Sequence, residues 1–102
     1  MKDKIDVYLI TGVAGFIGAN LANKLLMNKD KKIKIIGIDN LNDYYDIKLK
    51  KYRLMELKNF ENFKFIKCDI SNKETMDKVF KEYKPSIVIN LAAQAGVRYS
   101  IT

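Results

Sequence analysis

The stretch Thr11-Gly-Val-Ala-Gly-Phe-Ile-Gly18 decides the fold, because one periodicity ends in it and another begins. It follows a β-branched and aromatic run over residues 5–11, which predicts a strand. Within and after it, apolar residues recur at helical spacing over residues 17–26. A helix that starts directly after such a turn has backbone N–H groups at its first residues, here Phe16 and Ile17, that are able to bind an anion.

The three glycines of this stretch have separate expected roles. Gly12 permits a tight turn, Gly15 lets the backbone approach a pyrophosphate, and Gly18 lets the helix pack closely on the strand. Their spacing is Gly-x-x-Gly-x-x-Gly, which departs from the Gly-x-Gly-x-x-Gly pattern of dinucleotide-binding turns. Glycines that serve only the turn and the packing are therefore the alternative interpretation.

An acidic residue follows the glycines at the sequence separation expected for a dinucleotide-binding unit. Asp39 comes 21 residues after Gly18 and ends a second predicted strand, residues 33–39. A carboxylate there hydrogen-bonds an adenosine ribose and repels a 2′-phosphate, which favours NAD over NADP. The alternative is an exposed loop acid. Asp69, at the end of a third predicted strand over residues 63–68, is expected beside the adenine, with a plain turn residue as the alternative.

The remaining elements continue the alternation. Residues 47–58 predict a helix, Ser71-Asn-Lys-Glu74 has the spacing of a capping box for a third helix, Pro85 ends that helix, and residues 86–91 predict a fourth strand. Strands that alternate with helices predict an α/β fold with a doubly wound parallel sheet. We expect a sheet truncated to about four strands in the order 3-2-1-4, with three helices, since the last eleven residues have no helical pattern.

The composition excludes several classes of protein. The 102 residues include no His and one Cys, so His-based metal sites and triads are excluded and Cys68 has no disulfide partner, which fits a reducing cytoplasm. No apolar run approaches the roughly 20 residues of a membrane span. The net charge of +7 is the difference between 19 basic residues, 17 Lys and two Arg, and 12 acidic residues. The basic residues scatter over every predicted helix, so no nucleic-acid partner is expected.

Three segments resemble the NAD-dependent epimerase/dehydratase family of extended short-chain dehydrogenases/reductases. They are residues 11–18, the stretch Ile38-Asp-Asn-Leu-Asn-Asp-Tyr-Tyr-Asp46, and the stretch Asn90-Leu-Ala-Ala-Gln-Ala-Gly-Val-Arg-Tyr-Ser100. The second and third are more discriminating and resemble the UDP-glucuronate 4-epimerases of that family. The resemblance spans essentially the whole chain and implies a Rossmann-like sheet.

The resemblance also implies residues that contact NAD, in four groups. They are Gly12, Gly15, Phe16, Ile17 and Gly18 at the pyrophosphate; Asp39 and Asn40, with Asn42 and Lys50 as neighbours, at the adenosine ribose; Asp69 and Ile70 at the adenine; and Leu91, Ala92, Ala93 and Gln94 on the nicotinamide side. Arg98 is expected to contact phosphate or substrate, with a solvated loop cation as the alternative.

The catalytic residues of the family are expected beyond Thr102, the last residue of this chain. The family uses a Tyr-x-x-x-Lys pair with a nearby Ser or Thr, all located after a fifth strand. Tyr44-Tyr-Asp-Ile-Lys48 has the spacing, but it follows the second strand at the adenosine end and is interpreted as a coincidence. Residues 1–102 are thus expected to be the N-terminal part of an NAD-binding domain, without the catalytic segment and the sugar-binding domain.

The function implied by the resemblance is the NAD-binding part of a nucleotide-sugar 4-epimerase, with the fragment itself inactive and a nucleotide sugar as partner of the longer parent. A dehydratase or decarboxylase of the same family is one alternative, and a non-catalytic dinucleotide-binding module is another. We also expect that the chain self-associates or is only marginally stable, because the fourth strand and the first helix present uncovered apolar faces.

Overall fold

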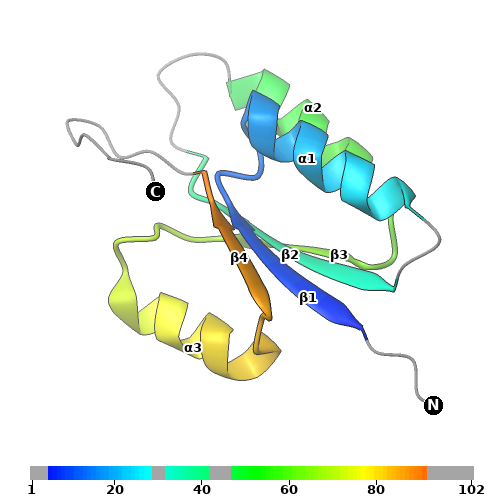
Figure 1. The fold of residues 1–102 in the computed structure, drawn as a ribbon. Coiled ribbons are helices and arrows are strands. Elements are labelled where there is room, and N and C mark those ends of the chain that lie inside the picture. The colour runs from blue at the N-terminus through cyan, green and yellow to red at the C-terminus, as the bar shows by residue number, and fades with distance from the viewer. Residues whose placement is uncertain (1–4, 29–31, 42–46, 92–102) are drawn as a thin grey trace.

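The computed structural model describes residues 5–28, 32–41 and 47–91. Its elements, in chain order, are β1 (Asp6–Thr11), α1 (Phe16–Met27), β2 (Ile33–Asp39), α2 (Ile47–Leu57), β3 (Phe63–Lys67), α3 (Lys73–Tyr83) and β4 (Ile87–Asn90). Within the described residues the strands form one parallel sheet in the order β3-β2-β1-β4 (Figure 1). The predicted order and the three helices are confirmed, and each predicted strand differs from the observed one by at most one residue at either end.

Strand β1 lies at the centre and sets the register of its neighbours. Thr11 pairs with Ile38 of β2 on one side and with Asn90 of β4 on the other. The carboxyl ends of these three strands therefore lie in one row. Since the chain first adds β2 and β3 on one side of β1 and then crosses to add β4 on the other, the order reverses at the β1–β4 boundary.

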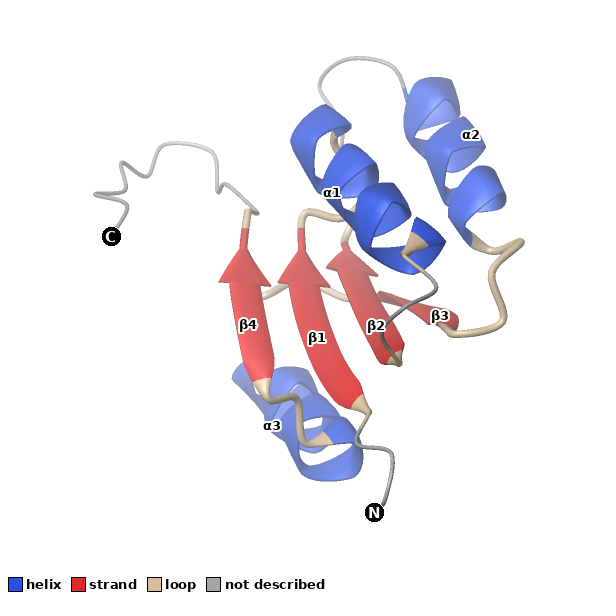
Figure 2. Cartoon of the chain, turned by 45° about the vertical axis from the view of Figure 1, so that its right-hand side comes forward, coloured by secondary structure: helices blue, strands red, loops and turns tan. Residues whose placement is uncertain are grey.

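The helices lie in two layers. Helices α1 and α2 cover one face of the sheet and α3 covers the other (Figure 2). In β1 the fully buried neighbours Leu9 and Ile10 face opposite ways: Ile10 packs with Ala22 of α1, and Leu9 packs in a second cluster with Val79 of α3. A strand that is buried on both faces reads as a continuous apolar run, which is what the sequence shows.

Strand β4 is less covered than the other strands of the described sheet. Val88, the register partner of Leu9, is exposed, whereas Leu9 is fully buried. Along residues 87–90 partly buried and exposed residues alternate, so the face of β4 that carries Val88 is open to solvent. The expected self-association through this strand stays a prediction.

The predicted cap of α3 is wrong by one residue. Asn72, not Ser71, is the N-cap, and its side chain accepts a hydrogen bond from the backbone N–H of Thr75. The Ser71 hydroxyl and the Ser71 backbone N–H instead both donate to Oδ1 of Asp69, each at 2.9 Å. The charged carboxylate of Asp69 is a strong acceptor, and its two hydrogen bonds hold Ser71 in a turn before the helix.

Candidate functional site

The carboxyl ends of the strands and the starts of α1 and α3 lie at one edge of the sheet (Figure 1). Ligands of open α/β sheets bind outside the carboxyl ends of the strands, where the strand order reverses. In this chain that place is the boundary between Thr11 and Asn90.

The glycine turn after β1 is built as its spacing predicts. Gly12 has a φ of 69°, in the left-handed region that favours glycine, and its N–H donates to Ile38 O at 2.8 Å. A Cβ on Gly18 would lie 2.3 Å from Gly12 O, so only glycine lets α1 approach the turn this closely. The expected roles of Gly12 in the turn and of Gly18 in the packing are confirmed, and contact with a pyrophosphate stays a prediction.

Helix α1 begins at this turn without a side-chain cap. Gly15 is its N-cap and has no side chain to accept the first N–H groups. The side chains of Phe16 and Ile17 are 69% and 66% exposed, so they do not close the helix start. Uncapped N–H groups at a helix start, together with the positive end of the helix dipole, favour an anion here.

Asp39 is buried and joins the end of β2 to the glycine turn. It is 6% exposed; its Oδ2 accepts from Ala14 N–H at 2.9 Å, and its Oδ1 accepts from Leu41 N–H at 2.8 Å. The alternative of an exposed loop acid is therefore wrong. A carboxylate offers about four acceptor positions, so these bonds leave capacity for a ribose hydroxyl.

Two cations of α2 reach the same edge. Lys50 Nζ lies 3.7 Å from Asp39 Oδ1. Arg53 Nη1 donates to Ala14 O at 3.0 Å, and its guanidinium lies 5.8 Å from the centroid of the Phe16 ring. The Ala14 peptide is thus held through its N–H by Asp39 and through its carbonyl by Arg53. Sequence reasoning missed Arg53, although its place three residues after Lys50 puts both on one side of the helix.

A second polar junction joins β1 to β4. The buried Thr11 hydroxyl donates to Asn90 Oδ1 and accepts from Leu91 N–H at 3.0 Å. Leu91 is thereby fixed at the point where the strand order reverses. Sequence reasoning missed Thr11 and Asn90 as site residues, because their bond spans 79 positions in sequence.

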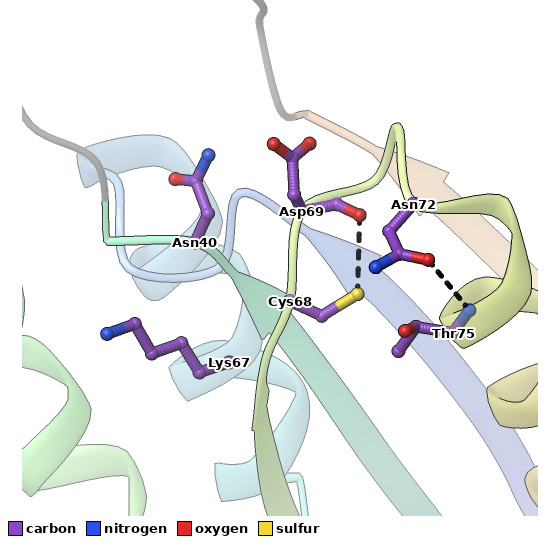
Figure 3. A pocket seen from close by; sticks show the side chains of 6 residues that line it. All are labelled: Asn40, Lys67, Cys68, Asp69, Asn72 and Thr75. Carbon is purple, nitrogen blue, oxygen red and sulfur yellow. Dashed lines mark hydrogen bonds between the residues drawn. The ribbon is translucent and has the colours of Figure 1, made fainter.

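A polar pocket of about 320 Å³ lies beside these groups, between the ends of β2 and β3 and the start of α3 (Figure 3). Its lining residues are Asn40, Lys67, Cys68, Asp69, Asn72 and Thr75. The structure thus brings Asn40 and Asp69 together, as a shared adenine and ribose region requires. The side chain of Ile70, the other residue expected at the adenine, packs against the apolar cluster under α3, and its contact with the adenine stays a prediction.

Two neighbouring residues of the pocket, Cys68 and Asp69, have pKa values that are shifted in opposite directions. The backbone N–H and hydroxyl of Ser71 hold the pKa of Asp69 below its ordinary value, because both bonds favour the carboxylate. Burial, and then the nearby charge of Asp69, raises the pKa of the Cys68 thiol, which donates to Asp69 O at 3.3 Å (Figure 3). The pocket therefore holds an ionised acid beside a neutral thiol, which is an unreactive form of cysteine.

Some expected site residues lie outside the described part of the chain. They are Asn42, Ala92, Ala93, Gln94 and Arg98. Thr102, beyond which the catalytic residues are expected, also lies outside it, so the position of those residues stays a prediction.

Two kinds of site are absent from the described residues. Across residues 5–28, 32–41 and 47–91, no group of His, Cys, Asp and Glu side chains is arranged to hold a metal ion. In the same three ranges, no helix has the length and apolar character to cross a membrane.

A parallel α/β sheet with a glycine turn at the reversal point and an acid at the end of the next strand defines the dinucleotide-binding class of proteins. The family model of the GDP-mannose 4,6 dehydratases matches residues 9–102, and the chain belongs to this family of NAD-dependent epimerases and dehydratases. The family resemblance of the three sequence segments is confirmed.

The chain is similar to characterised proteins of this family. It is 53% identical over 94 residues to the UDP-glucuronate 4-epimerase of Thermodesulfobacterium geofontis. This alignment covers 92% of this chain and 28% of the relative. The crystal structure of the UDP-glucuronic acid 4-epimerase from Bacillus cereus in complex with UDP-glucuronic acid and NAD is similar, with a TM-score of 0.75 and 35% identity over 90% of this chain and 28% of that chain. The dTDP-glucose 4,6-dehydratase of Bacillus anthracis in complex with NAD has the same TM-score, with 30% identity over 88% of this chain and 27% of that chain. The chain therefore spans less than a third of the length of these proteins.

Proposed function

We propose that this chain is the NAD-binding N-terminal portion of a nucleotide-sugar 4-epimerase that acts on UDP-glucuronate. The observation that carries the proposal is the doubly held Ala14 peptide, which fixes the glycine turn and the uncapped start of α1 beside the buried Asp39 carboxylate. This arrangement has an anion site and a hydroxyl acceptor side by side, which the pyrophosphate and the ribose of a dinucleotide require.

The described residues divide the binding of NAD among them. The N–H groups of Phe16 and Ile17 face the pyrophosphate, Asp39 accepts from the adenosine ribose, and the pocket formed with Asn40 and Asp69 holds the adenine. Leu91, fixed by Thr11, leads toward the nicotinamide side, where Ala92, Ala93 and Gln94 are proposed to continue the contact and Arg98 to reach phosphate or substrate.

The chemistry of the whole protein rests on the cofactor and on residues beyond this chain. NAD, when bound, supplies acceptance and return of a hydride at the sugar C4, so the net reaction is an isomerisation. The residues of this chain bind and orient the cofactor. We propose that the Tyr and Lys of the family's catalytic pair lie beyond Thr102 in the parent protein, and that residues 1–102 alone do not turn over substrate.

A dehydratase of the same family is the second candidate function. It is favoured by the match to the family model of the GDP-mannose 4,6 dehydratases and by the equal TM-score of the dTDP-glucose 4,6-dehydratase. The higher sequence identity to a UDP-glucuronate 4-epimerase favours the epimerase.

Titration calorimetry with NAD tests the cofactor, and product analysis with UDP-glucuronate tests the activity. We expect NAD to bind and UDP-glucuronate to stay unchanged.

Two variants test the contacts with the cofactor. Gly15→Val blocks the approach of a pyrophosphate and should weaken the binding of NAD and of NADP equally. Asp39→Asn should weaken NAD about tenfold, since a charge-assisted hydrogen bond contributes about 1.5–3 kcal/mol. Absence of NAD binding would refute the cofactor assignment, and turnover in protein free of host epimerase would refute the expected inactivity.

A further inference from the structure

The charge of Asp39 is not isolated at the ribose end of the site. Lys50 Nζ lies 3.7 Å from Asp39 Oδ1, and the Lys50 side chain is 21% exposed. The Asp39 side chain is almost fully buried, so solvent and salt screen this pair less than a surface pair. The group that would discriminate between NAD and NADP, the Asp39 carboxylate, therefore forms an ion pair with Lys50 through one of its oxygens.

Arg53 adds a second cation from the same helix, with a different attachment. Its guanidinium is engaged by Ala14 O and by the Phe16 ring, both of which belong to the glycine turn. Among the residues that the structure describes, one acidic side chain, Asp39, and two basic ones, Lys50 and Arg53, thus meet where β2, the turn and α2 come together. The net charge of these three side chains is positive, whereas a site that repels a 2′-phosphate by charge needs a negative net charge.

We propose that Lys50 is a specificity-determining residue that attracts an adenosine 2′-phosphate, so that the preference between NAD and NADP is the balance of Asp39 against Lys50. This inference rests on the proposed function, in which Asp39 accepts from the adenosine ribose. A phosphate monoester carries nearly two negative charges at neutral pH, and a lysine binds it as a point charge. Lys50 Nζ lies 3.7 Å from Asp39 Oδ1, so it is a described cation placed directly beside the carboxylate that is proposed to face the ribose hydroxyls.

The attachments of the α2 cations predict different effects on the two cofactors. Arg53 holds the glycine turn, which faces the pyrophosphate common to NAD and NADP, so it should act on both alike. Lys50 should act on the difference between them. Lys51, the exposed neighbour of Lys50 on the same helix, is a matched control of equal charge.

The test is titration calorimetry of NAD and of NADP at low ionic strength with four variants. We expect Lys50→Met to lower the ratio of NADP affinity to NAD affinity about tenfold, and Lys50→Arg, which keeps the cation, to leave this ratio within about twofold of the original. Arg53→Met should weaken both cofactors by the same factor, and Lys51→Met should change neither. Circular dichroism melts verify that each variant is folded.

The outcomes separate the inference from the function it rests on. If the unchanged chain binds neither NAD nor NADP, the proposed function fails and this inference fails with it. If the unchanged chain binds NAD but Lys50→Met leaves the affinity ratio as it was, or Lys51→Met lowers the ratio as much, the inference alone is overturned. If Lys50→Arg lowered the ratio of NADP affinity to NAD affinity as much as Lys50→Met does, the proposed role of the Lys50 charge would be overturned.

Discussion

Asp39 and Asp69 lie at the carboxyl ends of neighbouring strands, and they are held in opposite ways. Asp39 is buried and uses both carboxylate oxygens, one of them for a partner 25 residues away, Ala14. Asp69 is exposed, and the two hydrogen bonds to its carboxylate both come from Ser71, two residues on, to the single oxygen Oδ1. The first carboxylate ties β2 to the glycine turn and so builds the site, whereas the second shapes only its own loop and is displayed in the pocket. The edge of the sheet thus combines a region fixed by long-range contacts with a region fixed by local ones.

The largest effect should come from Gly18, in the long-range region. A Cβ at this position would lie 2.3 Å from Gly12 O and 3.0 Å from Val13 Cα, both backbone atoms. Gly18→Ala should therefore lower the free energy of unfolding by about 2–3 kcal/mol, despite the better helix propensity of alanine. Urea unfolding measures this loss. The matched control is Gly15→Ala, whose Cβ would lie 3.3 Å from the same oxygen, and an equal loss in both variants would contradict the close-packing role of Gly18.

The next effect separates the two carboxylates directly. In Asp39→Asn the amide nitrogen would replace one of two accepting oxygens and face either Ala14 N–H or Leu41 N–H, so a buried acceptor is lost. We expect a loss of about 1–3 kcal/mol in the free energy of unfolding. In Asp69→Asn the remaining oxygen satisfies both donors of Ser71, so the loss should stay within about 0.5 kcal/mol. Equal losses in the two variants would remove the distinction between the two regions.

A smaller effect tests which residue caps α3. Asn72→Ala removes the acceptor of Thr75 N–H and should cost about 1 kcal/mol of unfolding free energy. Ser71→Ala removes a hydroxyl that donates to an exposed carboxylate and should cost less. Thermal unfolding of both variants side by side measures the difference. A larger loss for Ser71→Ala would restore the capping box that the sequence pattern predicted.

The smallest effect concerns the titration of Asp69. Two hydrogen bonds from Ser71 lower the pKa of this carboxyl in the folded state, so their contribution to stability is present above the unfolded pKa and is lost as pH falls through the folded pKa. Ser71→Ala keeps the backbone donor and removes the hydroxyl, so the pKa of Asp69 should rise part of the way to its ordinary value. An NMR titration of the Asp69 carboxyl carbon measures this, and an unchanged pKa would show that the hydroxyl has no part in it.

The sequence predicted well what depends on periodicity and on local geometry. Apolar spacing placed every described strand and helix, and the alternation of elements determined the strand order. The glycine positions predicted the tight turn, in which Gly12 has a positive φ. The sequence did not predict the cap of α3, because Ser71 and Asn72 are both good N-cap residues. The Ser71 hydroxyl donates to the Asp69 carboxylate, and Asn72 caps the helix.

The sequence placed the candidate site residues at the ends of the predicted strands, but it did not predict the hydrogen bonds that join them. Asp39 was expected to face a ligand, and its bond to Ala14 was not foreseen, because that bond depends on how closely β2 approaches the turn. The contact of Arg53 with the turn and the bond of Thr11 with Asn90 join segments far apart in sequence. Such contacts follow from the packing of the whole sheet, which no window of sequence contains.

The bond from Ala14 N–H to Asp39 also determines how the turn moves. Amides of glycine-rich turns usually exchange their hydrogens with solvent quickly, through small local openings. The Ala14 amide is fully buried and donates to a buried carboxylate on another strand, so its exchange requires the turn to detach from β2. We expect this amide to exchange as slowly as those inside β1, in concert with the β1–α1–β2 unit. The turn then belongs to the most persistent cooperative part of the protein, and a ligand meets it as a rigid surface that needs no ordering.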